Sequence, residues 1–358
     1  MKSEDSFFAA AIESATAFNQ AVQDVALTSG LFDSLSHFSS VDAVIRRMGF
    51  LPEHGARVEN LLRILSNEGS LIERQSDGLS VFRANTDIVD VLRDRPNGGR
   101  FHATDTLTDW YDARHLERIR ESNFNFFGRD LSFLRRRGEA LRFDGQYEDV
   151  WRTNLTNPLY EFGRLLCVRE LVAEGATRFL DLACGMGFGS QRLAEFADGP
   201  ARITGVDRSS DFLQIARQGS YLDARTDFIE RDLNSGLITL PAGSVDGILF
   251  NGAFHFIQDK PALLRQMWQA LRPGARLAIG HCFSRSNFAD ERMHDFHFSL
   301  LENVSWPLPW SELVDLVDHC GFEVYKQFHR GSHSYLVARR LAVVSEPDVV
   351  VEPDLDSS

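Results

Sequence analysis

The chain has 358 residues, 43% of them hydrophobic, which is enough to bury a large core, in two domains by our interpretation. Its formal net charge of -13 at pH 7 argues against general binding to nucleic acid or anionic membranes, because phosphates require a basic surface. The four cysteines form no CxxC pair and are too scattered for a disulfide scaffold, and no apolar run approaches the roughly 20 residues of a membrane span. We therefore expect a reduced cytoplasmic protein.

Residues 1–99 are predicted to form a small, mainly helical domain of the winged-helix type. Residues 6–36 place apolar side chains at three- and four-residue spacing, with Gly30 as a stop. A second helix begins after Ser40, a plausible N-cap, and a third ends near Gly69. Two extended runs in LIERQSDGLSVFRA then predict a hairpin, and three short helices with a hairpin make a winged helix.

A winged helix can bind DNA, so that role must be compared with a packing role. The candidate recognition helix, residues 56–66, carries Arg57 and Arg63 against Glu59 and is otherwise mostly apolar. A helix that reads a DNA groove usually has a clear surplus of basic and amide side chains. The apolar N-terminal helices favour a homodimer without a nucleic-acid partner. A ligand-sensing, DNA-binding regulator is the alternative.

The rest of the chain divides into three parts. Residues 100–156 are an irregular, aromatic-rich helical connector. From residue 157 to 342, strand-like and helix-like segments alternate, which predicts an α/β domain with a parallel sheet wrapped by helices. Residues 343–358 carry five acids and no base, and we expect a disordered acidic tail.

A glycine-rich turn follows the first strand of the α/β domain in FLDLACGMGFGS. Asp181 ends the strand, and Gly185, Gly187 and Gly189 follow. Glycines let backbone amides approach a ligand closely, and the next helix adds partial positive charge at its N-terminus. A dinucleotide site would need its third glycine one position later, and the lack of G-K-[ST] excludes a P-loop. The turn alone leaves its ligand undefined.

Two further acids close the next two strands. Asp207 ends ITGVD, where a carboxylate can accept both hydroxyls of a ribose. Asp232 ends FIERD, where it can accept from an adenine amino group while Leu233 covers the ring. Carboxyl ends of parallel strands meet at one edge of the sheet, so these acids predict a nucleoside crevice. Asp181 would repel a pyrophosphate, which favours a ligand bearing an ammonium or a sulfonium group.

On these motifs the sequence resembles the class I S-adenosylmethionine-dependent methyltransferases. DLACGMG is similar to their glycine motif, GVD to their ribose acid and RDL to their adenine acid. With VALTSGLFDSLS and LLRILSNEGSLIER, the resemblance narrows to small-molecule O- and C-methyltransferases that carry an N-terminal winged-helix dimerisation domain. Most relatives have a further glycine where this chain has Ala183-Cys184, and both replacements are small.

The resemblance implies a Rossmann-like parallel sheet with an antiparallel last strand, S-adenosylmethionine as cofactor, and a small-molecule acceptor in specialised metabolism. The connector at residues 100–156 would contribute to the acceptor pocket. The cofactor-binding residues that it implies are Asp181, Gly185, Gly187, Asp207, Arg208, Asp232, Leu233 and Asn251.

Methyl transfer to a hydroxyl or an enolisable carbon requires a group that removes the proton, and histidine suits this task at neutral pH. His255 lies in NGAFHF, directly after the fourth strand. In the O-methyltransferases that the chain resembles, the general base lies in this loop within a His-Asp-Trp triplet. Here the triplet is His255-Phe256-Ile257, so the acidic partner of the base is not identified. O-methylation with His255 as general base is our leading hypothesis.

A second group of histidines supports an alternative. His294 and His297 are three residues apart and would share one helical face. With His255 they could hold a divalent or ferric ion for C-methylation of a 2-oxo acid. Otherwise they would line the acceptor pocket with Phe127 and Trp306. Such a lining favours an aromatic or branched apolar acceptor over a sugar or a polyamine.

Overall fold

The computed structural model describes most of the chain between residues 17 and 341. The described ranges are 17–94, 113–128, 130–137, 142–156, 158–172, 175–197, 199–219, 225–283, 291–301, 303–330 and 333–341. The predicted acidic tail lies outside them, as does much of the first half of the connector. Among the described residues, no helix is both long enough and apolar enough to cross a membrane.

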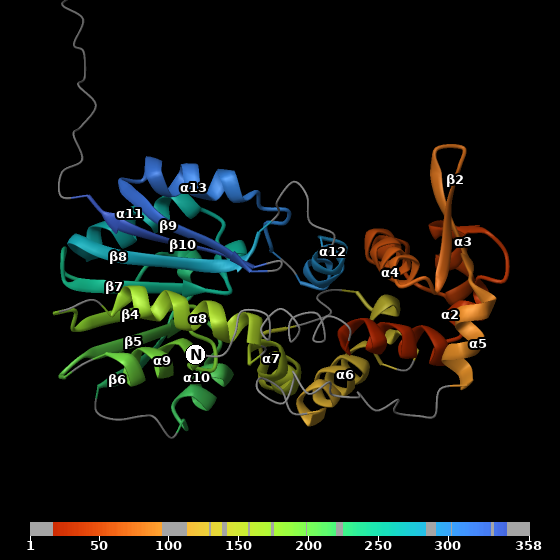
Figure 1. Cartoon of the computed structure of the whole chain (residues 1–358), viewed down its shortest axis with the longest axis horizontal. Coiled ribbons are helices and arrows are strands. Elements are labelled where there is room, and N and C mark those ends of the chain that lie inside the picture. Colours follow the sequence, from red (N-terminus) through yellow and green to blue (C-terminus); the bar gives the residue numbers. More distant parts are fainter. Residues whose placement is uncertain are drawn as a thin grey trace, which may run out of the picture.

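A seven-stranded sheet forms the centre of the larger part of the molecule (Figure 1). Its first five strands pair in parallel, and β10 runs antiparallel to both of its neighbours. The sheet confirms the prediction of a Rossmann-like fold with an antiparallel last strand. In spatial order the strands are β6 (Thr226–Glu230), β5 (Arg202–Asp207), β4 (Arg178–Leu182), β7 (Val245–Asn251), β8 (Leu271–Cys282), β10 (His333–Arg340) and β9 (Phe322–Arg330).

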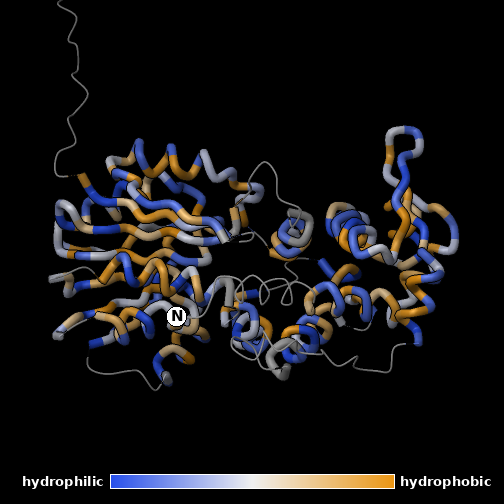
Figure 2. The backbone as a smooth tube through the Cα atoms, viewed as in Figure 1, coloured by the Kyte–Doolittle hydropathy of each residue, from blue (hydrophilic) through white to orange (hydrophobic). Residues whose placement is uncertain are grey.

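Helices cover both faces of this sheet because alternate strand residues point to opposite faces. On β4, Phe179 packs with one hydrophobic core, whereas Leu180 and Leu182 pack with another. Figure 2 shows hydrophobic residues concentrated along the strands. The first core includes residues of α8 (Pro158–Leu171) and α9 (Phe188–Phe196), and the second those of α11 (Lys260–Ala270) and α13 (Trp310–His319). The shorter α10 (Ser210–Ala216) follows β5.

One contact joins α8 closely to the sheet. Tyr335 on β10 is fully buried, and its ring lies against two glycines. A Cβ atom added to Gly163 on α8 would lie 1.8 Å from the Tyr335 Cζ atom, and one added to Gly280 on β8 would lie 2.1 Å from its Cδ1 atom. The Tyr335 ring therefore fills the space that these two residues leave empty.

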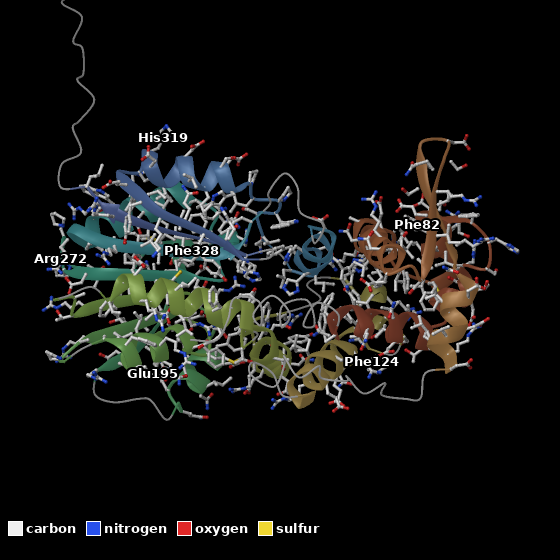
Figure 3. The ribbon with its side chains drawn as sticks, viewed as in Figure 1. Phe82, Phe124, Glu195, Arg272, His319 and Phe328 are labelled. Atoms are coloured by element: carbon white, nitrogen blue, oxygen red, sulfur yellow. The ribbon has the colours of Figure 1, made fainter. Side chains whose placement is uncertain are left out.

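The N-terminal part contains the helices and the hairpin that the sequence predicts. Residues 17–28 are helical, Ser40 accepts a hydrogen bond from the backbone nitrogen of Ala43, and Phe82 is buried in the core (Figure 3). A three-stranded sheet has the order β1-β3-β2. The elements are α2 (Leu31–Ser34), β1 (Ser39–Ser40), α3 (Val41–Met48), η1 (Pro52–His54), α4 (Gly55–Asn67), β2 (Leu71–Ser76), β3 (Leu79–Ala84) and α5 (Thr86–Asp94).

Several segments lie between the N-terminal part and the sheet, and their apolar residues join those of the N-terminal part in one hydrophobic core. Phe127, which the sequence places in the acceptor pocket, lies instead in this core. Its ring centroid is 5.7 Å from that of Phe18 and 5.6 Å from that of Phe296, and 2% of the residue is exposed. The helix α12 packs against α4 (Figure 1). These segments are α6 (Ala113–Phe127), η2 (Ser132–Arg135), η3 (Gly145–Tyr147), α7 (Glu148–Leu155) and α12 (Glu291–Ser299).

Candidate active site

A cavity with about 880 Å³ of empty space, partly open to solvent, lies at the carboxyl edge of the sheet. Its lining has two chemically different sides. The polar side contains the residues that follow β4, β5, β6 and β7. It includes Gly185, Asp207, Arg208, Asp232, Leu233 and Asn251. The aromatic side includes Trp151, Tyr160, Phe256, His281, His297 and Phe298.

The glycine turn contains residues with left-handed backbone. Gly185 has φ 53° and Gly187, which precedes the first residue of α9, has φ 83°. Ala183 adopts φ 52°, a region that favours glycine. Gly185 lines the cavity, whereas Gly187 lies outside its lining and shapes the start of α9.

Asp181 supports this turn from beneath, and its side chain does not line the cavity. It is 3% exposed and accepts a hydrogen bond from the Ser190 hydroxyl at 2.8 Å. A Cβ atom on Gly189 would lie 2.6 Å from the Asp181 Oδ2 atom, so the missing side chain lets α9 approach the carboxylate. Burial raises the pKa of Asp181 to about 6, although the Ser190 hydrogen bond and the charge of Arg164 both lower it. The expectation that Asp181 faces the ligand is therefore corrected.

This pKa predicts how an Asp181→Asn substitution changes stability. The unfolded carboxyl ionises near 3.8, whereas the folded one keeps its proton to about pH 6. Stability of the wild type therefore falls as the pH rises through this window, and the variant lacks that loss. Between about pH 4.5 and about pH 7, the variant should gain about 2 kcal/mol relative to the wild type. Urea unfolding of both proteins at both pH values measures the difference. A difference that does not change with pH would contradict it.

Asp207 joins the end of β5 to the glycine turn. Its Oδ2 atom accepts from the Gly185 backbone nitrogen and its Oδ1 atom from that of Ser209, both at 2.8 Å. Burial raises its pKa, and these two hydrogen bonds oppose that rise. The residue also lines the cavity, so its carboxylate can hold the turn and face a ligand. The neighbouring Arg208 places its guanidinium over the Phe143 ring, 5.5 Å from the centroid.

The next two strand ends complete the polar side. Asp232 caps η4 (Leu233–Ser235), accepting from the Asn234 backbone nitrogen at 2.9 Å, and Leu233 lies beside it in the lining. The Asn234 side chain donates to the Phe256 carbonyl oxygen at 3.0 Å and accepts from the Gln258 backbone nitrogen at 2.8 Å. Asn234 therefore fixes the loop after β7, a role that the sequence analysis missed.

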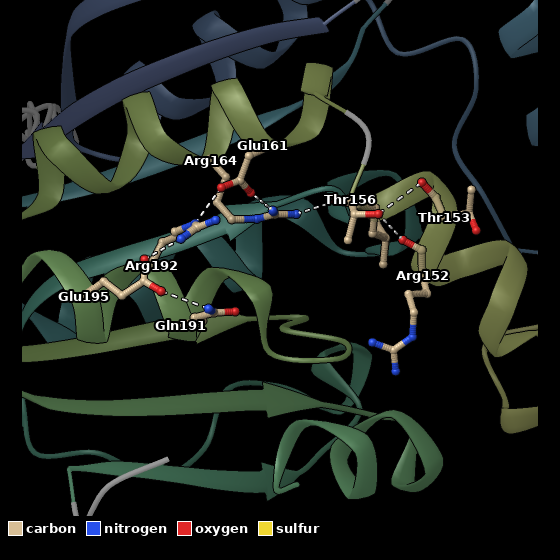
Figure 4. A network of polar contacts seen from close by, with 9 residues as sticks. Arg152, Thr153, Thr156, Glu161, Arg164, Gln191, Arg192 and Glu195 are labelled. Carbon is tan, nitrogen blue, oxygen red and sulfur yellow. Dashed lines mark hydrogen bonds and ion pairs between the residues drawn. The ribbon is translucent and has the colours of Figure 1, made fainter. Parts of the chain in front are cut away.

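An ion-pair network braces the helices behind the turn (Figure 4). Arg164, whose side chain is 5% exposed, pairs with Glu161 at 2.5 Å and donates to the Leu155 carbonyl oxygen at 2.9 Å. Arg192 on α9 also pairs with Glu161, at 2.5 Å, and with Glu195. The network links α7, α8 and α9, and places the Arg164 charge where it lowers the pKa of Asp181.

Tyr160 and His281 meet on the aromatic side of the cavity, and the sequence analysis assigned neither of them a role. The Tyr160 hydroxyl on α8 is 3.0 Å from the Nε2 atom of His281 at the end of β8. Both residues line the cavity, and His281 is 5% exposed. His297 also lines the cavity, as predicted, and its ring lies edge-on to Trp151 at 6.2 Å.

His255 lies behind this surface. It is fully buried in η5 (Phe254–Phe256), outside the cavity lining, with its Nδ1 atom 3.2 Å from the Ser305 carbonyl oxygen. Its ring centroid is 4.7 Å from that of His281 and 5.7 Å from that of Trp306. Trp306 lies outside the lining as well, and its indole nitrogen donates to the Asp295 carboxylate at 2.6 Å.

Four histidines, at positions 255, 281, 294 and 297, lie near Phe298, and His333 contacts two of them; those with a lowered pKa are held neutral. Desolvation lowers the pKa of His297 to about 4 and that of His333 to about 3. It lowers those of His281 and His294 well below their ordinary value, and the charged forms of neighbouring histidines lower them further. His294 is buried near Trp306, at 5.9 Å between centroids, and outside the cavity lining.

These side chains do not fit a metal centre. Within the described residues, no group of three or more histidine, cysteine, aspartate or glutamate side chains is arranged to hold a metal ion. His255 and His294 both lie against Trp306, whereas His297 packs against Trp151. The predicted ligand set of these three histidines is therefore not supported.

Comparison with known proteins identifies the α/β part. Residues 173–312 match a family described as a methyltransferase domain. Over 120 residues the chain is 33% identical to a trans-aconitate 2-methyltransferase from Azoarcus sp., covering 32% of this chain and 45% of the relative. A second trans-aconitate 2-methyltransferase, from Paracidovorax citrulli, is 29% identical over 43% of this chain and 56% of its own length. The chain thus spans about half the length of these relatives.

Solved structures share the fold over nearly the whole chain. The CurJ carbon methyltransferase has a TM-score of 0.63 at 15% identity, covering 93% of this chain and 94% of its own. An O-methyltransferase family protein from Burkholderia thailandensis has a TM-score of 0.51 at 18% identity, covering 90% and 94%. At these identities the likeness shows the fold alone. The match over residues 173–312 and the shared fold both support the prediction of a methyltransferase domain in the α/β part.

Proposed function

We propose that the whole protein transfers a methyl group from S-adenosylmethionine to a small, largely apolar acceptor. The observation that carries this proposal is a cavity whose lining combines strand-end carboxylates with aromatic rings and histidines. A cofactor beside the polar residues and an acceptor beside the aromatic residues would share one cavity. Alignment of two reactants in this way can supply on the order of 7–11 kcal/mol of a barrier.

The residues of the polar side fit S-adenosylmethionine. Asp207 would accept from the ribose hydroxyls, Asp232 would accept from the adenine amino group, and Leu233 would cover the adenine ring. Arg208 and Asn251 lie in the same lining and would complete the site. When bound, the cofactor supplies an electrophilic methyl group on a sulfonium.

The aromatic side supports an aromatic or branched apolar acceptor, because Trp151, Phe256 and Phe298 offer flat, apolar contacts. We favour methylation of a hydroxyl, in specialised metabolism, with proton removal by a histidine of the group that surrounds the predicted base His255. C-methylation of a 2-oxo acid is the alternative. The described residues do not assemble its predicted metal site, and we derive no step through a metal.

We further propose that residues 1–99 form the winged-helix dimerisation domain, that residues 100–156 contribute to the acceptor pocket, and that residues 157–342 are catalytic. In the candidate recognition helix, Arg63 pairs with Glu59 at 2.6 Å and Arg57 donates to the Ser299 carbonyl oxygen at 2.5 Å. These contacts within the chain favour packing over DNA reading. Light scattering would measure the dimer. Salt-sensitive, sequence-selective shifts of genomic fragments would instead support the regulator.

A reduced, cytoplasmic setting is also part of the proposal. Among the described residues Cys167, Cys184 and Cys320 are free thiols, as expected where disulfides do not form.

Transfer of a labelled methyl group tests the proposed function. The protein is incubated with methyl-labelled S-adenosylmethionine and a panel of phenols and 2-oxo acids, and the products are identified by mass spectrometry. We expect methyl ethers of phenols together with equimolar S-adenosylhomocysteine. Labelled 2-oxo acids methylated at carbon would favour the alternative, and calorimetry that detects no cofactor binding would contradict both.

A further inference from the structure

We propose that His281, supported by Tyr160, is the group that takes the acceptor's proton, and that the acceptor is a neutral aromatic molecule with a phenolic hydroxyl. This inference rests on the proposed function and deepens it. It assigns the acid–base role to His281 in place of His255, the base that the sequence predicts. Tyr160 and His281 form one hydrogen-bonded pair on the wall of the cavity.

The glycine at position 252 lines the cavity directly beside the rings of Tyr160 and His281. Gly252 has φ 98°, and a Cβ atom there would lie 3.7 Å from the Tyr160 Cε1 atom and 3.8 Å from the His281 Cδ2 atom. Its backbone nitrogen donates to the Gly280 carbonyl oxygen at 2.8 Å, which holds it beside the end of β8. Gly252 itself lines the cavity, so only bare backbone covers this side of the two rings.

The hydrogen bonding of His281 leaves capacity for a ligand. Its Nε2 atom is 3.0 Å from the Tyr160 hydroxyl. Its Nδ1 atom is buried and has no hydrogen-bond partner among the described residues. The residue as a whole is 5% exposed. Burial of an unpaired imidazole nitrogen is unfavourable, so His281 has hydrogen-bonding capacity that the fold itself does not use.

The surroundings of His281 keep its imidazole in the neutral form. It faces Tyr160 on α8, His255 on η5, His333 on β10, and His294 and His297 on α12. Burial and the charged forms of these histidines lower the pKa of His281 well below its ordinary value. The imidazole is therefore neutral near pH 7.

The transfer step balances in atoms and in charge. The acceptor oxygen forms a bond to the methyl carbon, and the carbon–sulfur bond breaks with its electron pair going to sulfur. The phenolic proton passes to His281, either directly or through the Tyr160 hydroxyl, which gives its own proton to Nε2. One positive charge is present before the step, on the sulfonium, and one after it, on the imidazolium.

His255 then acts as a positioning residue. Its ring lies edge-on to His281 at 4.7 Å between centroids, and its Nδ1 atom is held by the Ser305 carbonyl oxygen. From this place outside the cavity lining it would fix the orientation of the His281 ring.

The test compares two probes, the neutral 4-methylphenol and its methyl ether 4-methylanisole, bound to the protein with S-adenosylhomocysteine. The wild type should bind the phenol about tenfold more tightly, because the phenol alone can donate a hydrogen bond to His281. His281→Phe should bind both probes equally. The matched control His319→Phe changes an exposed histidine on α13 and should keep the preference (Figure 3).

The ratio of the two affinities is measured on one protein at a time, so a general loss of stability in a variant does not imitate the result. A wild type without preference would overturn the proposal, and so would a His281→Phe variant that keeps it while His255→Phe loses it. Calorimetry with S-adenosylmethionine distinguishes failure of the proposed methyltransferase function from failure of the proposed role of His281. Normal cofactor binding with no phenol preference would contradict the role of His281 and leave the proposed function standing.

Discussion

Replacement of Asp207 by alanine should abolish measurable binding of S-adenosylmethionine. The carboxylate lines the cavity and also accepts hydrogen bonds from the Gly185 and Ser209 backbone nitrogens, so its loss removes a ligand contact and releases the turn. Hydrogen bonds to a charged group contribute about 1.5–3 kcal/mol each, so we expect the affinity to fall at least about a hundredfold. Isothermal titration calorimetry measures it.

Asp227→Ala is the matched control for this experiment. Asp227 lies on β6, the strand next to β5, and is exposed. The same chemical change there should leave the affinity within about twofold of the wild type, as for most surface substitutions. Circular dichroism would verify that both variants fold. An unchanged affinity in Asp207→Ala would mean that the cofactor does not bind at the carboxyl end of β5.

Gly163→Ala should destabilise the fold strongly although it adds a single methyl group. The added Cβ atom would lie within 2.1 Å of three atoms of the buried Tyr335 ring. Overpacking of this kind costs typically 1–3 kcal/mol, and the contact with a fully buried ring places the expected loss near the upper end, at about 3 kcal/mol. Urea unfolding of the cofactor-free protein measures the change.

Gly55→Ala provides the comparison. Gly55 begins α4, and a Cβ atom there would meet only the Ile45 Cδ1 atom, at 4.0 Å. Alanine is the better helix former, so this variant should be as stable as the wild type or slightly more stable. A Gly163→Ala variant within about 0.5 kcal/mol of the wild type would show that Tyr335 moves aside easily.

The sequence predicted the parts of the molecule that depend on local pattern. Strand-helix alternation gave the sheet, and the left-handed turn at Gly185 and Gly187 follows from residue type. Asp207 and Asp232 line the cavity because each ends a parallel strand, and such ends share one edge. The direction of a side chain at such an end is harder to predict, and Asp181 points beneath the turn toward Ser190.

The aromatic side depended on contacts between distant segments. Tyr160 and His281 are separated by 121 positions, and neither lies in a local motif that marks a site. Phe127 and Phe298 are both phenylalanines in helices and both pack in the same core, yet only Phe298 also lines the cavity. With 28 phenylalanines in the chain, composition cannot distinguish these two environments.

The ring of Tyr335 between Gly163 and Gly280 has a consequence for how this protein can change. Gly163 is three positions after Tyr160 on α8, and Gly280 directly precedes His281 on β8. A larger residue at either glycine is tolerated only with a smaller one at position 335, so substitutions at these three positions are expected to be strongly non-additive. Substitutions among Gly163, Gly280 and Tyr335, none of which lines the cavity, would thereby alter the distance between the Tyr160 and His281 side chains.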